Sequence, residues 1–220
     1  MARNVTIHTG ELTGAQTFVG GKGKRDTLII DPIDKGNDDS AFISLDGIIQ
    51  GSQLDGSTIQ EIEHLQVRAS QDLSLAFVTG NESNNDLRVV GAGIASSDSS
   101  RTSVIVQAGA GNDTIFVDNS YDLQVYAEDG NDTVNFGSQY QRSFIYESGD
   151  SGSTGNDVYN LGQGSDYVQY DINSLAPIGR DDINGFTVGQ DTIAFDNPLR
   201  KSASETGIRS SRPLMAERSM

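Results

Sequence analysis

Apolar and polar residues alternate along this chain in short runs that end at turns rich in glycine and aspartate. Clear runs occur at 104–106, 115–117 and 123–125. A period of two over so few residues is typical of half-buried β-strands, and no long segment shows the 3.6-residue period of a helix. Short strands with regular turns predict an all-β protein whose parallel strands coil into a solenoid.

One phrase organises the pattern. It runs from Gly109 to Val117, where small and turn-forming residues lead to Asp113 and then to an alternating apolar run. Similar phrases return at 129–136, 155–160 and 162–168. Self-similarity of this kind is the sequence signature of a repeat architecture.

The remaining chain divides around these repeats. Residues 1–60 hold degenerate copies and predict an irregular N-terminal β region, and residues 61–197 hold the solenoid. Within it, Leu73, Leu75 and Phe77 alternate as one half-buried strand. The apolar residues of 182–195 predict a final capping hairpin, since a solenoid needs its end covered. Residues 198–220 predict an extended tail.

Composition adds charge to this picture. The 220 residues carry 31 acidic and 15 basic side chains, a net charge of −16 that disfavours nucleic acid and anionic membranes. Bound cations would relieve the self-repulsion, although acidic surface can simply maintain solubility. There is no cysteine and no apolar stretch long enough to insert in a membrane. The N-terminal residues lack the apolar core of a signal peptide, so we expect no general secretory export.

The turns carry the candidate chemistry. Glycine permits backbone conformations that expose carbonyl oxygens, and aspartate adds a carboxylate. Calcium takes six to eight oxygen ligands in irregular geometry, which two stacked turns can supply. Glycine, asparagine and aspartate are also good turn formers without any metal. The candidate ligands are Asp113, Asp132, Asp157, Asp166, Gly109, Gly111, Asn112, Asp129, Gly130, Asn131 and Gly155.

Spacing predicts which turns stack. Asp113 and Asp132 are 19 residues apart, close to one full coil of two nine-residue halves, so they should lie on one side in adjacent rungs. Asp157 follows 25 residues later, and an insertion around 140–153 could leave it stacked on Asp132. Asp166 is nine residues beyond Asp157, which places it on the opposite side.

These residues resemble the glycine- and aspartate-rich nonapeptide of the RTX (hemolysin-type) family. Residues 108–116 depart from that pattern only at the first glycine, and 152–160 and 161–169 follow it with one departure each. The resemblance is good over 104–195 and weak over 16–45. It implies a parallel β-roll in which Asp113, Asp132, Asp157 and Asp166 bind Ca²⁺ with the turn carbonyls. The repeats are few and interrupted, and the basic tail differs from usual RTX secretion signals.

No catalytic constellation accompanies the repeats. His8 and His64 do not form a zinc motif, and no nucleophile elbow is present, so we expect no enzyme activity. A parallel β-helix polysaccharide enzyme, with Tyr140, Arg142 or Tyr167 in its site, is the catalytic alternative.

The tail suggests a partner. On an acidic body its basic residues could dock on another subunit or on the same chain; they are Arg200, Lys201, Arg209, Arg212 and Arg218. We therefore expect a calcium-binding structural protein that stabilises a larger assembly of protein subunits, as a virion (phage capsid) decoration or cement protein and a homo-oligomer. The alternative is a secreted RTX protein or a cell-surface adhesin or carbohydrate-binding module.

Overall fold

The computed structural model describes residues 6–9, 12–21, 25–36, 38–92, 102–138, 140–148, 155–171 and 179–196. All regular elements among them are β-strands, which confirms the predicted all-β class. No helix of these residues could span a membrane. The strands are β1 (Thr6–His8), β2 (Thr17–Val19), β3 (Thr27–Ile33), β4 (Ser40–Ser44), β5 (Ile49–Gln50), β6 (Thr58–Gln60), β7 (His64–Ala69), β8 (Leu75–Thr79), β9 (Asp86–Val90), β10 (Ser103–Gln107), β11 (Thr114–Asp118), β12 (Ser120–Tyr126), β13 (Thr133–Phe136), β14 (Tyr140–Ser148), β15 (Val158–Asn160), β16 (Ser165–Asp171), β17 (Asp182–Asn184) and β18 (Thr192–Asp196).

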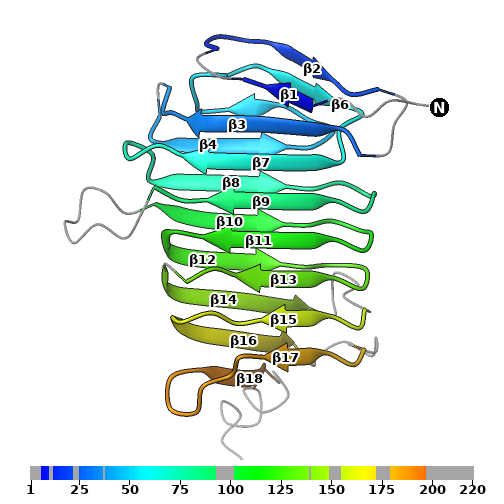
Figure 1. The fold of residues 1–220 in the computed structure, drawn as a ribbon, viewed down its shortest axis with the longest axis vertical. Coiled ribbons are helices and arrows are strands. Elements are labelled where there is room, and N and C mark those ends of the chain that lie inside the picture. The colour runs from blue at the N-terminus through cyan, green and yellow to red at the C-terminus, as the bar shows by residue number, and fades with distance from the viewer. Residues whose placement is uncertain are drawn as a thin grey trace, which may run out of the picture.

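Two eight-stranded sheets form the body. Sheet I has the order β1-β3-β7-β9-β11-β13-β15-β17, and sheet II the order β18-β16-β14-β12-β10-β8-β4-β5. From β7 onward successive strands alternate between the sheets, and each pairs in parallel with the strand two places away in sequence. One strand from each sheet makes a rung, and the rungs stack along the long axis (Figure 1). The predicted parallel β-roll architecture is therefore present.

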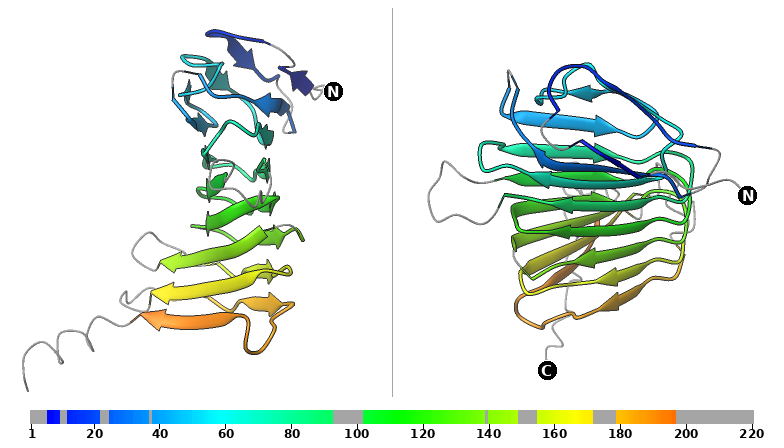
Figure 2. Two further views of the ribbon diagram at one scale, coloured as in Figure 1. Left: turned by 90° about the vertical axis from the view of Figure 1, so that its left-hand side faces the viewer. Right: turned by 45° about the horizontal axis from the view of Figure 1, so that its top comes forward.

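The two sheets face each other as separate layers, and they twist along the stack (Figure 2). Aliphatic side chains fill the space between them. In the rung of β10 and β11, Val104, Val106, Ile115 and Val117 are all 0% exposed. Burying four such side chains contributes about 6–12 kcal/mol before the entropy of ordering the chain is subtracted. Each rung thus adds a layer of core, and the side chains of that layer pack against the layers of the neighbouring rungs.

The outward face of sheet II is partly aromatic, and the sequence pattern predicted the wrong face for one of these aromatic residues. In β8 the buried side chains are Ala76 and Val78, whereas Phe77 lies on the outer face against Phe42, with ring centroids 5.8 Å apart. The predicted phase of this strand is therefore wrong. Alternation alone could not choose between the two faces because both carry apolar residues, and the register with β4 and β10 sets the choice.

The N-terminal region is irregular, as predicted: among the described strands, β2 and β6 form a separate small sheet, and β5 pairs antiparallel with β4. β1, β3 and β4 belong to the same two sheets as the later strands. The predicted C-terminal end needs correction. There β17 pairs with β15 in sheet I and β18 with β16 in sheet II, both in parallel. The predicted capping hairpin is wrong: residues 182–196 form a last rung. The tail lies outside the described residues.

Candidate metal centre

Three of the predicted aspartates stack next to the N-terminal ends of the strands of sheet I. Strands β11, β13 and β15 pair in register, with Thr114 beside Thr133 and Thr133 beside Val158. The residue before each strand therefore falls in line, and we call Asp113, Asp132 and Asp157 the carboxylate column. The 25-residue step from Asp132 to Asp157 leaves the stacking intact because the extra residues lie outside β13 and β15, in β14 and the segments on either side of it.

Hydrogen bonds hold this column in register. The backbone N–H of Asp113 donates to Oδ1 of Asp132 (2.7 Å), and the N–H of Asp132 donates to Oδ1 of Asp157 (2.8 Å). The carbonyl oxygens of Asp113 and Asp132 accept the N–H of the first strand residue in the next rung, at 2.9 and 2.8 Å. Each rung is thus tied to the following one through both a carboxylate and a carbonyl.

A parallel line of asparagines lies outside the column. The N–H of Asn131 donates to Oδ1 of Asn112, and that of Asn156 donates to Oδ1 of Asn131, both at 2.8 Å. All three side chains are exposed, whereas the carboxylates are turned inward. In the Gly-Asn-Asp phrase the asparagine therefore links neighbouring turns on the exposed side, and the aspartate links them on the buried side.

The glycine of this phrase is required by close packing. Gly130 has φ of +144°, and a Cβ there would overlap the carbonyl oxygen of Gly111 in the preceding rung. A Cβ on Gly155 would in the same way overlap the carbonyl of Gly130. The turns therefore stack at a separation that only glycine allows.

Two of the three inner oxygens of the column are left without partners. Asp113 and Asp132 are each 1% exposed, and the Oδ2 atom of each is buried with no hydrogen bond. Oδ2 of Asp157 accepts the hydroxyl of Tyr159 at 3.2 Å. Burying an ionised carboxylate without compensation costs several kcal/mol, so these oxygens need either a proton or a cation.

The same cost of burial raises the pKa values of the three aspartates. Burial raises the pKa of Asp113 to about 7, that of Asp132 to about 8 and that of Asp157 to about 6. The backbone N–H bonds act in the opposite direction, and neighbouring carboxylates raise the pKa values further. Near neutral pH the column is therefore partly protonated by itself, and a divalent cation would compete with those protons.

The column continues beyond the predicted residues at both ends. The N–H of Asp157 donates to Oδ1 of Asp181 (3.0 Å), and the N–H of Asn85 donates to Oδ1 of Asp113 (2.7 Å). Further along, the N–H of Asp26 donates to Oε2 of Glu63 (2.9 Å). The signal for Asp181 was present, because Gly179-Arg180-Asp181 keeps the glycine and the aspartate of the phrase and changes only the asparagine.

The other predicted ligands surround the column or lie apart from it. Gly109, at φ +90°, donates its N–H to Glu128, and the carbonyl of Asp129 accepts the N–H of Gly111 at 2.8 Å. Asp166 lies on the opposite side, in sheet II, as its nine-residue spacing predicts. Its N–H donates to Asp191 Oδ1 at 3.0 Å, so it belongs to a separate pair of acids.

The donors of the column fit a hard cation. They are carboxylate oxygens from adjacent rungs, and Ca²⁺ prefers oxygen ligands. Within the described residues no three acidic or histidine side chains converge on one point, so carbonyl oxygens would have to complete the coordination.

No family model, curated protein or solved structure matches this chain. The resemblance to the RTX repeat and the binding of calcium therefore remain predictions. The predicted partner-binding residues Arg200, Lys201, Arg209, Arg212 and Arg218 lie outside the described residues.

Proposed function

We propose that this protein is a non-enzymatic, Ca²⁺-dependent β-solenoid of the RTX type, whose role is to stabilise a larger assembly. The observation that carries the proposal is the pair of buried, unpartnered Oδ2 atoms on Asp113 and Asp132 in successive rungs. A cation bound between these rungs would compensate both charges and join the two turns. Calcium would then act as a folding ligand of the solenoid.

A thermal melt tests the calcium proposal. Titrating Ca²⁺ into chelator-treated protein should raise the melting temperature with concentration, because a ligand that binds only the folded state stabilises it. Mg²⁺ at the same concentration should have a smaller effect, since it demands octahedral geometry and gives up its water reluctantly. An unchanged melting temperature over the whole titration would reject the calcium sites.

A matched pair of variants assigns any calcium effect to the column. Asp113→Asn removes one of the two inner carboxylates, whereas Asp86→Asn makes the same charge change at an exposed residue of β9. The calcium-dependent rise should shrink in the first variant and persist in the second. Equal losses in both would show that calcium acts through the net charge of −16 and not through a site.

The assembly part of the proposal concerns the chain's partners. The acidic body and the basic residues beyond 198 favour contacts between copies or with other protein subunits, with a virion (phage capsid) as the predicted setting. Sedimentation of the full chain and of a chain ending at residue 197 tests this. The full chain should form oligomers that dissociate at high salt, and the shortened chain should be monomeric. A monomeric full chain would contradict a homo-oligomer.

The competing function is that of a secreted or cell-surface glycan-binding module. One specific observation favours it, an arginine-lined hollow on the outer face of sheet I.

A further inference from the structure

A hollow of about 250 Å³ lies on the outer face of sheet I, across β3, β7 and β9. Its polar lining includes Asp31, Gln66, Arg68 and Arg88, and Val90 is part of its apolar lining. A hollow of this size on a regular sheet face needs a local cause.

A bulge in β3 coincides with the hollow. The pairing of β3 with β7 shifts register between Ile30 and Ile33, which places Asp31 in the irregular part of the strand. Bulges bend a strand and re-aim its side chains, and they are frequent beside functional sites. A second hollow, of about 380 Å³, adjoins the first and shares Asp31 and Arg68 with it.

Two guanidinium groups are held in place at this hollow. Arg68 donates to both carboxylate oxygens of Asp31, at 2.8 and 2.7 Å, which fixes the plane of its guanidinium group. Arg88 lies over the ring of Phe116, 4.0 Å from its centroid, and forms no ion pair within the described residues. Its N–H groups at the edge of that stack are therefore available to an incoming anion.

This cationic spot contrasts with the rest of the surface. The chain carries a net charge of −16, and between residues 36 and 141 its basic residues are only Arg68, Arg88 and Arg101. The first two lie in neighbouring strands of one sheet and line one hollow. A ligand with widely spaced single carboxylates would be complementary here, whereas a polyanion with the charge density of a nucleic acid would be repelled by the body.

We propose that this hollow binds a carboxylated sugar unit of an acidic polysaccharide. The Arg88 guanidinium would receive the carboxylate in a two-point contact, and the N–H groups of Arg68 that are not bound to Asp31 would donate to a hydroxyl group of the sugar. The amide of Gln66 would bond a hydroxyl group, and Val90 would contact the apolar edge of the sugar ring.

The same outer row offers a path for neighbouring sugars. In register beyond Arg88 and Phe116 come Asn135, Asn160 and Asn184. Their amides form a chain of hydrogen bonds, 2.8 Å from Asn160 to Asn135 and 3.0 Å from Asn184 to Asn160. One amide per rung is a regular series of donors and acceptors suited to the hydroxyl groups of a linear glycan.

A peptide is less well matched to this surface. Extended peptides gain affinity by pairing with a free sheet edge, but β3, β7, β9, β11 and β13 are each paired on both sides. The proposal stands apart from the calcium sites, because the hollow uses outward side chains and the carboxylate column uses inward ones.

The test is calorimetric titration of the full chain with tetragalacturonate, at one fixed free Ca²⁺ concentration. The wild type should bind the carboxylated tetrasaccharide, with affinity that falls as salt is added, and should not bind a neutral galactose tetrasaccharide. Arg88→Gln should weaken binding at least tenfold.

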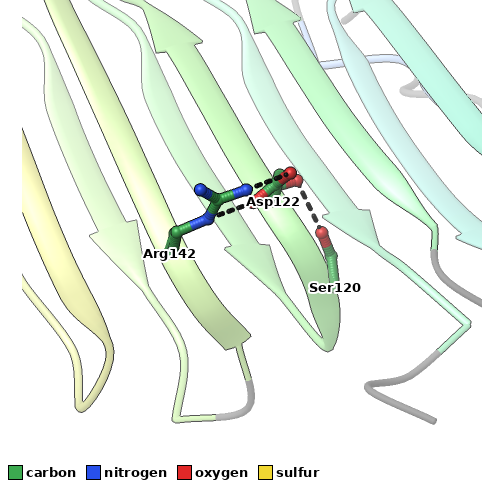
Figure 3. A network of polar contacts seen from close by, with 3 residues as sticks. All are labelled: Ser120, Asp122 and Arg142. Carbon is green, nitrogen blue, oxygen red and sulfur yellow. Dashed lines mark hydrogen bonds and ion pairs between the residues drawn. The ribbon is translucent and has the colours of Figure 1, made fainter. Parts of the chain in front are cut away.

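The matched control is Arg142→Gln on sheet II. Arg142 also forms an exposed two-point ion pair, with Asp122 at 2.8 and 3.0 Å, next to Ser120 (Figure 3). Its loss changes the net charge equally, so tetragalacturonate binding should be retained. Equal weakening by both variants, equal binding of the neutral tetrasaccharide, or absence of binding by the wild type would overturn the proposal. Tighter binding of tetraglutamate than of tetragalacturonate would also overturn it, in favour of an acidic peptide ligand.

Discussion

Replacing Asp132 by asparagine should have opposite effects on stability with and without calcium. Asparagine has nearly the same shape, and its Oδ1 can still accept the N–H of Asp113. It removes the carboxylate whose Oδ2 is buried without a partner. In chelator the variant should therefore be more stable than the wild type. In calcium it should be less stable, because a ligand for the cation has been lost.

The magnitude in chelator follows from the pKa of Asp132, which burial raises from 3.8 to about 8. At pH 7 the folded carboxyl is mostly protonated and the unfolded one is ionised, so folding takes up a proton across a gap of about three pH units. This costs about 4 kcal/mol of folding free energy, which asparagine avoids, but the buried Nδ2 amide of asparagine costs about 1–3 kcal/mol in turn. For a chain of this length a net gain of about 2 kcal/mol corresponds to roughly 5 °C in melting temperature.

Thermal melts by circular dichroism at pH 7, in chelator and in saturating Ca²⁺, measure both effects. Asp86→Asn, at an exposed residue of β9, is the control. It should change the free energy of unfolding by no more than about 0.5 kcal/mol in either condition. If the Asp132 variant melts below the wild type in chelator, the buried carboxylate is satisfied without a cation. The reasoning from its unpartnered oxygen would then be refuted.

Other properties of the stack should respond as follows. In chelator the wild-type melting temperature should fall as pH rises from about 4 to about 8, because the buried carboxyl groups with raised pKa values stabilise the fold only while they are protonated. Saturating calcium should reduce this fall. A melting temperature that rises with pH in chelator would contradict the prediction. Gly130→Ala should lower the free energy of unfolding by at least about 3 kcal/mol in denaturant titrations, because the added Cβ meets the backbone of Gly111. Gly189→Ala is the control: its Cβ points into open space at φ +87°, and the variant should cost about 1 kcal/mol. Equal costs for the two variants would exclude close stacking as the cause. Asn131→Ala should cost about 1 kcal/mol in the same titrations through the loss of the bond from the N–H of Asn156, and no loss would show that water replaces it.

Much of the fold could be predicted because the repeat determines it locally. The alternation after Asp113 and Asp132 gives the strands, and the 19-residue step gives the stacking. The offset of Asp157 was larger, yet the phrase itself marked its place. Local chemistry, with glycine for close approach and aspartate turned inward, is visible without knowledge of the rest of the chain.

What could not be predicted depends on pairing between distant residues. Glu63 lies beside Asp26, 37 residues away, with no shared phrase to indicate it. The outward position of Phe77 follows from neighbouring strands and not from its own strand. Residues 185–190 have the composition of a hairpin turn, but the strands they join lie in different sheets. The hollow at Arg88 arises from a bulge in β3, which periodicity does not reveal.

The hydrogen bonds from aspartate N–H groups to aspartate carboxylates in the column all run in one direction along the chain. The N–H of each aspartate is satisfied by the carboxylate of the next rung, which is closer to the C-terminus. An aspartate N–H therefore loses its acceptor only when the following rung is lost, whereas loss of the preceding rung removes the acceptors of strand and asparagine N–H groups, as at Thr133 and Asn131. The two ends of such a stack therefore lose different hydrogen bonds when they fray. A chain emerging from its N-terminus cannot complete one rung until the following turn has arrived.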